Sequence, residues 1–214
     1  MIASFFHRKI QIYIAAATLL LFLLIALDIY FEGTLFRFDA VVHQWSLAWH
    51  TPLGDRLVYG ITQLGNLSTM LVYLLVLTFY FLRKGEKRIL PLLWGSMAGG
   101  AALFSLIKEL FRRARPSSYI GDFHQHGYSF PSGHATMSMV LALSLFYLFY
   151  PRTEGISRVL LLVFVFLFPV MIAFSRLYLG VHYFTDVTGG LVLGIFWVML
   201  MVLVFSRPSQ ATKP

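Results

Sequence analysis

The sequence predicts an all-α, polytopic membrane protein in which six transmembrane helices form a single domain, residues 1–214. Of the 214 residues, 58% are hydrophobic and 12% are charged, a composition typical of chains that fold in a bilayer. The hydrophobic residues gather in six runs, most of them near the roughly 20 residues that a helix needs to cross a membrane. Backbone polar groups find no water in hydrocarbon, and a helix satisfies them internally. These observations together favour a helical bundle.

The six runs alternate with short polar segments that mark the expected boundaries. The first run follows His7, Arg8 and Lys9 and is longer than a signal-peptide core, so we expect it to remain as the first span. The second, fourth and fifth runs are short, and their helices are expected to extend into the flanking turns. The expected spans are 10–29, 67–82, 89–107, 135–150, 159–174 and 187–205.

Residues 31–66, between the first two spans, form an outer amphipathic segment. Trp45, Trp49 and Tyr59 alternate there with polar residues, a pattern that favours one or two short helices in the membrane interface. The segment can serve as a cap on the bundle or as the lining of an entry for a lipid substrate. The sequence leaves both interpretations open.

The basic residues indicate the orientation of the bundle. Placing both termini in the cytoplasm puts ten of the 17 Lys and Arg residues on the cytoplasmic side, as the positive-inside rule expects. Arg37 and Arg56 lie in the outer segment, and five more basic residues crowd at two outer loop edges: Lys108, Arg112, Arg113, Arg115 and Arg176. The alternative is the reverse topology. Positive charge gathered on the outer side predicts an anion-binding site there.

The segment from Ser175 to Asp186 places ionisable residues beside membrane-depth sequence, where they need partners or a function. His182 and Asp186 lie four residues apart, which on a helix puts them on one face, so that the carboxylate can accept the imidazole N–H. Such a partner fixes the tautomer and activates the other ring nitrogen as a nucleophile or base. Arg176 brings a planar set of donors for a phosphate. The alternative is an Arg176–Asp186 salt bridge beside a structural histidine.

A second cluster, from Lys108 to Pro116, stands at the outer end of the third span. Lys108 and Arg115 are seven residues apart, or two helical turns, and we expect both to point from one helix face at a shared anion. Pro116 favours an end to this helix at Arg115. The alternative is a set of charges that simply reaches from the helix end into the interface.

The third cluster, Phe130 to His134, directly precedes the fourth span. Pro131, Ser132 and Gly133 predict a turn and a helix start, where unpaired backbone N–H groups bind anions. Ser132 adds a hydroxyl donor, Gly133 lets the backbone approach a ligand, and His134 can transfer a proton. The alternative is an ordinary helix cap.

Together the three clusters predict phosphoryl transfer in which protein cations stabilise the phosphate, one histidine attacks and the other protonates the departing oxygen. The carboxylate partner favours His182 as the attacking residue. Asp122, His124 and His126 have an alternate spacing that metal ligands can show, but the proposed site takes its positive charge from the protein. We therefore expect neither a metal nor a cofactor. The chain has no cysteine, which excludes thiolate chemistry.

These motifs, K-x6-R-P, P-S-G-H and S-R-x5-H-x3-D, resemble the three-part signature of the type 2 phosphatidic acid phosphatase (PAP2) superfamily. Among its members, the chain is most similar to bacterial membrane enzymes of the phosphatidylglycerophosphate phosphatase B and undecaprenyl pyrophosphate phosphatase types. The resemblance implies that His182 forms a phosphohistidine, that Asp186 orients it, and that His134 protonates the leaving group and later activates water. It also implies the residues that hold the phosphate: Lys108, Arg115, Ser132, Gly133 and Arg176.

The resemblance further implies metal-independent hydrolysis of a lipid phosphate or diphosphate. Phosphatidylglycerophosphate, phosphatidate, undecaprenyl diphosphate and lipid A phosphates all fit, and membrane lipids rather than nucleic acid are the expected partners. The expected location is the cytoplasmic membrane of a bacterium, with the active site on the extracytoplasmic side. Two alternatives remain at this point: a lipid phosphotransferase that uses the same intermediate, and an anion or lipid transporter.

Overall fold

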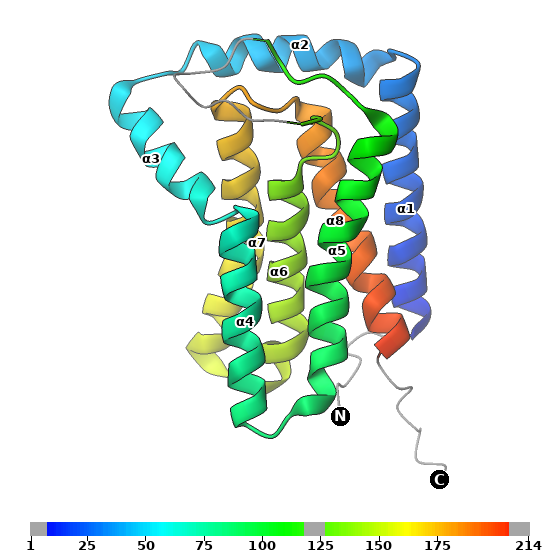
Figure 1. Ribbon diagram of the computed structural model, residues 1–214, viewed down its shortest axis with the longest axis vertical. Coiled ribbons are helices and arrows are strands. Elements are labelled where there is room, and N and C mark those ends of the chain that lie inside the picture. Colours follow the sequence, from blue (N-terminus) through cyan, green and yellow to red (C-terminus); the bar gives the residue numbers. More distant parts are fainter. Residues whose placement is uncertain (1–7, 118–126, 206–214) are drawn as a thin grey trace.

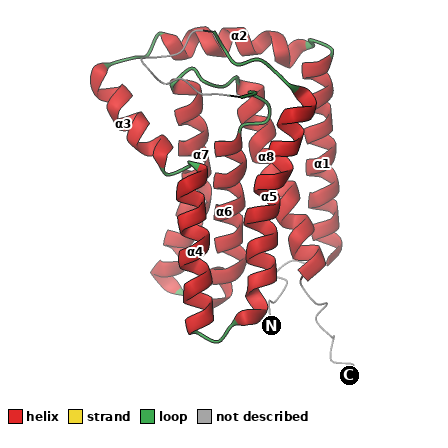
Figure 2. Cartoon of the chain, viewed as in Figure 1, coloured by secondary structure: helices red, strands yellow, loops and turns green. Residues whose placement is uncertain are grey.

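The protein is a multi-pass helical membrane protein. The computed structural model describes residues 8–117 and 127–205, and within these ranges helices are the only regular secondary structure (Figures 1 and 2). Five helical spans are long and apolar enough to cross a membrane, and one bent helix pair brings the number to six. The predicted fold class is therefore confirmed.

Each of the six expected spans lies inside a helical segment. The fourth and fifth extend into their flanks, as expected, whereas the second gains a single residue at its end. The helices are α1 (Arg8–Tyr30), α2 (Thr34–Leu47), α3 (Pro52–Gln63), α4 (Leu67–Arg83), α5 (Leu90–Phe111), α6 (Gly133–Phe149), α7 (Gly155–Tyr178) and α8 (Phe184–Phe205), with short 3₁₀ turns at Lys87–Ile89 and Tyr150–Arg152.

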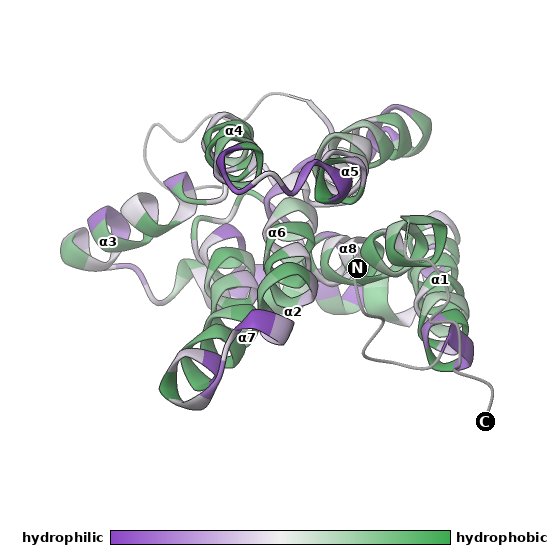
Figure 3. Cartoon of the chain, turned by 90° about the horizontal axis from the view of Figure 1, so that it is seen from below, coloured by the Kyte–Doolittle hydropathy of each residue, from purple (hydrophilic) through white to green (hydrophobic). Residues whose placement is uncertain are grey.

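Helix α6 lies at the centre of the bundle and packs against α4, α5, α7 and α8, while α1 packs along the outside of α8. Figure 3, which looks along the bundle, shows hydrophobic residues over most of the helix surfaces. Large apolar side chains on the outer faces are exposed, among them Leu20, Leu75 and Phe166. Such an apolar exterior is expected of a surface that contacts lipid.

The outer segment forms two helices rather than one. Helix α2 crosses one end of the bundle and contacts α1, α7 and α8 (Figure 1). Helix α3 slopes away from it and meets α4 at a bend of 44°, so that the pair makes the sixth candidate span. Although the segment is amphipathic, Asp39 on α2 is only 2% exposed, and this burial brings α2 into the site described below.

The start of α6 is held against the first turns of α8 by a close helix contact. A Cβ atom at Gly190 would lie 2.7 Å from the carbonyl oxygen of Ser132, so only glycine allows the two backbones to approach this far. The Ser132 N–H donates to the carbonyl oxygen of Asp186 at 2.9 Å. This contact places the Phe130–His134 turn beside the residues at the start of α8.

Candidate active site

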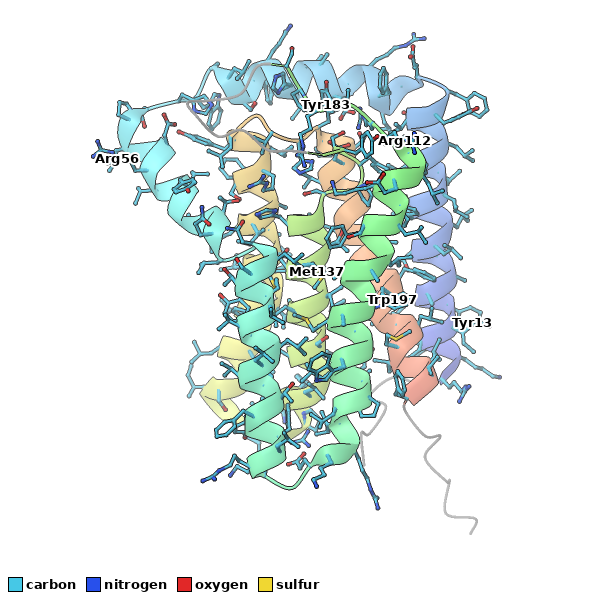
Figure 4. All side chains as sticks on the ribbon, viewed as in Figure 1. Tyr13, Arg56, Arg112, Met137, Tyr183 and Trp197 are labelled. Carbon is cyan, nitrogen blue, oxygen red and sulfur yellow. The ribbon has the colours of Figure 1, made fainter. Side chains whose placement is uncertain are left out.

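The three predicted clusters meet at the end of the bundle that α2 covers. They come from the end of α5 and the loop after it, the start of α6, and the turn between α7 and α8. Figure 4 shows Arg112 and Tyr183, from two of these segments, at this end of the molecule. The fold thus brings three clusters that are well separated in sequence into a single site.

His182 and Asp186 are in contact, but not through the helical spacing that the sequence predicts. Helix α7 ends at Tyr178 and α8 begins at Phe184, so His182 lies in the turn between them and that part of the prediction is wrong. The turn still brings His182 Nδ1 within 3.3 Å of Asp186 Oδ2. A carboxylate can only accept, so Nδ1 carries the proton and Nε2 presents its lone pair.

Arg115 lies on the opposite side of the His182 ring. Its Nη1 is 3.0 Å from His182 Nε2 and donates to the carbonyl oxygen of Val181 at 2.9 Å. Burial lowers the pKa of His182 well below its ordinary value, and the positive charge of Arg115 and of further nearby cations lowers this pKa more. The imidazole is therefore neutral at neutral pH, as a nucleophile requires.

The prediction that Lys108 and Arg115 share one helix face is also wrong. Helix α5 ends at Phe111 because Arg112 adopts a left-handed conformation, with φ 48°, and its N–H closes on the Lys108 carbonyl. This helix end, rather than Pro116, terminates α5. The loop turns back, so that Arg115 Nε donates to the Gly127 carbonyl at 3.0 Å. Lys108 Nζ donates to the Tyr128 carbonyl at 2.6 Å. Arg115 and Lys108 thus bind two consecutive residues, Gly127 and Tyr128, in the segment that leads to α6.

Arg176 and Ser132 carry polar atoms that suit an anion. Arg176 is 1% exposed, and its Nη1 donates to Thr62 Oγ1 at 2.7 Å. Its Nε and Nη2, like Ser132 Oγ, have no hydrogen-bond partner among the residues that the structure describes. A buried guanidinium with unused donors is costly unless acceptors reach it. Phosphate oxygens would supply such acceptors.

Asp186 belongs to a buried charge network that the sequence analysis did not foresee. Arg113 donates to Asp186 Oδ1 and to Asp39 Oδ2, each at 2.6 Å, and these three side chains are 8%, 0% and 2% exposed. Asp39 also accepts from the N–H of Thr185 at 2.9 Å. The expected alternative, a salt bridge from Arg176 to Asp186, is wrong because Arg113 takes that place.

Two of these partners were missed for different reasons. Arg113 stands in a run with Arg112 and Arg115, and nothing in that run tells which arginine turns inward. Asp39 is 74 residues away from Arg113 in the chain. It is one of three acidic residues in the amphipathic segment, and nothing in the sequence distinguishes it from Glu32 and Asp55. A third missed residue is Asn66, whose Oδ1 is 2.7 Å from Nε2 of His134.

Gly133 stands where α6 packs on α5. A Cβ atom there would lie 2.8 Å from the Phe104 ring, so packing alone already requires glycine at this position. Asp122, His124 and His126 lie outside the described residues. In the part of the chain that the structure describes, no three His, Asp or Glu side chains gather where they could hold a metal ion.

The comparisons with known proteins identify a family and related lipid phosphatases. The family model described as "PAP2 superfamily" matches residues 88–209. Phosphatidylglycerophosphatase B of Bacillus subtilis is 26% identical over 168 residues, which cover 76% of this chain and 81% of that protein. Lipid A 1-phosphatase of Rhizobium johnstonii is 28% identical over 168 residues, covering 65% of this chain and 64% of that protein.

A solved structure has the same fold. The crystal structure of a transmembrane PAP2 type phosphatidylglycerolphosphate phosphatase from Bacillus subtilis matches with a TM-score of 0.73 and 28% sequence identity. The match covers 88% of this chain and 94% of that chain. The similarity thus covers most of the helical bundle.

The charge network predicts that two carboxylate-to-amide substitutions lower the free energy of unfolding by very different amounts. Asp39→Asn removes a buried partner of Arg113, and we expect it to lower the free energy of unfolding by roughly 3–5 kcal/mol, the usual cost of breaking a buried pair. Glu86→Gln removes a carboxylate whose pair with Arg152 is 38% exposed on both sides; its expected cost is about 0–1 kcal/mol. Equilibrium unfolding of both purified variants in one detergent checks this, and equal losses would contradict the buried network.

Proposed function

The chain belongs to the PAP2 superfamily, and from this premise we propose that it hydrolyses a phosphate ester or diphosphate of a membrane lipid through a phosphohistidine on His182. One observation carries the proposal. The two nitrogens of a buried, neutral imidazole lie between a carboxylate, at 3.3 Å, and the guanidinium of Arg115, at 3.0 Å. The carboxylate keeps the proton on Nδ1 and so leaves the lone pair on Nε2 for attack. Arg115, which donates to Nε2 in this structure, would give that hydrogen bond to a phosphate oxygen when substrate binds.

His182 Nε2 attacks phosphorus as the bond from phosphorus to the lipid oxygen breaks. The ring then carries a positive charge, which Asp186 stabilises through the proton on Nδ1. Asp186 is held for this role on both oxygens, because Arg113 contacts Oδ1 and the N–H of Tyr183 donates to Oδ2 at 2.9 Å. A carboxylate fixed in this way keeps the ring in one tautomer and one orientation.

The phosphate oxygens are stabilised by buried and half-buried donors around His182. Arg115 and Arg176 provide guanidinium groups, Lys108 an ammonium, and Ser132 a hydroxyl. Gly133 opens α6, whose first N–H groups and dipole favour an anion. Arg176 and Ser132 have unused donors before substrate binds, so these two groups stabilise the transition state with little reorganisation. This positive charge comes from the protein, and the proposal needs no metal or cofactor.

His134 is the proposed acid for the departing oxygen. It protonates that oxygen in the first step and removes a proton from water in the second, when water attacks the phosphohistidine and releases inorganic phosphate. A phosphotransferase would differ only in the second step, where a hydroxyl of an acceptor would replace water. Release of inorganic phosphate distinguishes the two.

Several features support a lipid substrate. The named relatives act on lipid phosphates, and the bundle is apolar on its outside. A cavity of about 260 Å³ between α2 and α7 is lined by apolar side chains that include Trp45, Trp49 and Leu177. Leu177 and Tyr178, which both line it, belong to the last turn of α7, so the cavity lies at the same end of the bundle as the proposed site. This observation favours the entry interpretation of the outer segment; the physiological lipid can be phosphatidylglycerophosphate, phosphatidate, undecaprenyl diphosphate or a lipid A phosphate.

The location we propose is the cytoplasmic membrane of a bacterium, with the site facing outward. At the end of the bundle opposite α2 (Figure 1), the α4–α5 and α6–α7 connections and the helix ends beside them carry six basic residues: Arg83, Lys84, Lys87, Arg88, Arg152 and Arg158. Basic loops favour the cytoplasm. The site, at the other end, would then face the extracytoplasmic side.

Phosphate release tests the function itself. We expect purified wild-type protein to release phosphate from phosphatidylglycerophosphate, phosphatidate or undecaprenyl diphosphate in excess chelator, because protein cations carry the charge. His182→Ala should release none, and Asp186→Asn should retain a slower activity because the ring is less firmly oriented. Full activity of a folded His182→Ala protein would overturn the mechanism. No release from any lipid by wild type would overturn the proposed activity.

Arg115 and Arg112 form a matched pair for testing phosphate stabilisation. Loss of the Arg115 donor in Arg115→Ala should lower kcat/KM by roughly 10²–10³, by analogy with removal of an oxyanion-hole donor. Arg112 is exposed, with its Nε on the Glu109 carbonyl, and Arg112→Asn keeps a residue that tolerates its left-handed conformation. That variant should stay within about twofold of wild type, the range expected of a surface change. Equal losses in both variants would argue against a specific role for Arg115.

The covalent intermediate can be trapped with His134→Ala and labelled p-nitrophenyl phosphate. This substrate has a good leaving group and needs little protonation, whereas breakdown of the phosphohistidine lacks its base, so labelled protein should accumulate. A nitrogen–phosphorus bond survives alkali and breaks in acid, so the label should stay after alkaline quenching and disappear in acid. The double variant with His182→Ala should carry no label; an acid-stable label would indicate a different nucleophile.

A further inference from the structure

The bend between α3 and α4 forms a side of the site that none of the three motifs includes. Thr62, near the end of α3, accepts from Arg176 Nη1 at 2.7 Å. A Cβ atom at Gly65 would lie 3.1 Å from Cδ2 of His134, so the backbone of the bend lies directly against the imidazole ring. Asn66, the next residue, contacts the same ring. The bend thus contacts both a proposed phosphate ligand and the proposed acid.

The side chain of Asn66 is diverted from its ordinary local role. Asn66 is the N-cap residue of α4, with φ −64° and ψ 148°, but its side chain makes no capping hydrogen bond. At such a position, asparagine usually accepts from the helix's own N–H groups. Here Oδ1 instead lies 2.7 Å from Nε2 of His134. The side chain of Asn66 therefore makes a contact with a residue 68 positions away instead of a capping hydrogen bond within α4.

The second contact of Asn66 decides which way its amide points. Nδ2 donates to Oε1 of Gln63, and the main chain of Gln63 is fixed because its backbone carbonyl accepts from Thr69 Oγ1 at 2.7 Å. The oxygen of Asn66 therefore faces His134. Since an amide oxygen only accepts, His134 Nε2 must carry a hydrogen, and Nδ1 is the nitrogen left for exchanging a proton with a reactant.

We propose that Asn66 is a positioning residue for proton transfer: it holds a proton on Nε2 of His134 and thereby assigns the transferred proton to Nδ1. This proposal rests on the proposed function and adds a residue to it. In the first step, the Nδ1 proton moves to the departing oxygen as the phosphorus–oxygen bond breaks and the His182 Nε2–phosphorus bond forms. The neutral His134 that remains keeps its Nε2 proton on Asn66. In the second step, Nδ1 takes a proton from the attacking water.

A positioning role and a merely structural role predict different dependences on the leaving group. An alkoxide leaving from a short-chain phosphatidate needs the proton, whereas p-nitrophenolate leaves without much help. We compare kcat/KM for these two substrates, because this ratio reports the step in which the first leaving group departs. A general loss of structure would lower both values alike.

Asn66→Leu and Asn66→Asp are matched variants of nearly the same shape, and only the aspartate keeps an acceptor for Nε2. Asn66→Leu should lower kcat/KM for the phosphatidate by about 10- to 100-fold, part of the roughly 10²–10⁴ that general acid catalysis contributes. Its value for p-nitrophenyl phosphate should change by less than about threefold, since that reaction makes little use of the acid. Asn66→Asp should retain most of the activity on both substrates.

A double variant tests whether Asn66 affects activity only through His134. If Asn66 acts only through that ring, Asn66→Leu should cost nothing further on the phosphatidate once His134→Ala is present. Thr62→Val serves as a contrast. It removes the acceptor for Arg176, a proposed phosphate ligand, and should lower kcat/KM on both substrates by a similar factor.

The results distinguish a positioning role of Asn66 from a purely structural role. Loss confined to the alkyl phosphate and absent from the His134→Ala background supports the proposal. Equal losses on both substrates in folded Asn66→Leu, or additive losses in the double variant, would overturn it. If Asn66→Leu does not fold, the comparison of wild type with Asn66→Asp decides, and a large selective loss in that acceptor-retaining variant also overturns the proposal. If wild type itself releases no phosphate from either substrate, the proposed function fails instead.

Discussion

The two ion pairs that Arg113 makes with Asp39 and Asp186, each at 2.6 Å, join the site to the helix that covers it. Two buried carboxylates so close together are costly unless a cation lies between them, and Arg113 meets that need. Helix α2, the loop after α5 and the start of α8 must therefore assemble together. Asp186 keeps its second oxygen for His182 and the Tyr183 N–H, so a contact that stabilises the fold also orients the proposed nucleophile.

Around this network, cations exceed carboxylates. Arg115 and Arg176 approach the same region, and two guanidinium nitrogens of Arg176 find no acceptor within the described ranges. The excess positive charge contributes, after burial, to the low pKa of His182. The same charge would attract a phosphate, whose oxygens satisfy the unused donors. The same excess of positive charge thus suits both the binding of a phosphate and a neutral imidazole at His182.

The two proposed catalytic histidines have different partners, and the difference suits their proposed roles. His182 faces a carboxylate, which stabilises the positive ring formed by attack on phosphorus. His134 faces a neutral amide, which fixes the ring but does not bind its proton as strongly as a carboxylate would. The first partner lies four residues away in sequence and the second 68. Through Asp39 and Asn66, the outer segment contacts residues of the proposed site.

The sequence alone determined the helical fold class, the six apolar spans and the three clusters that meet at one end. Hydrophobic run length and local motifs depend only on residues that are close together in the chain. It did not determine how the chain behaves between those motifs. The left-handed Arg112 ends α5 early, and a turn rather than a helix carries His182, yet this turn still brings His182 into contact with Asp186. Packing between segments about 70 residues apart selects the arginine that pairs with Asp186. The same kind of packing brings Asp39 and Asn66 into the site. Only tertiary structure decides such pairings, since burial selects one partner among several chemically similar ones.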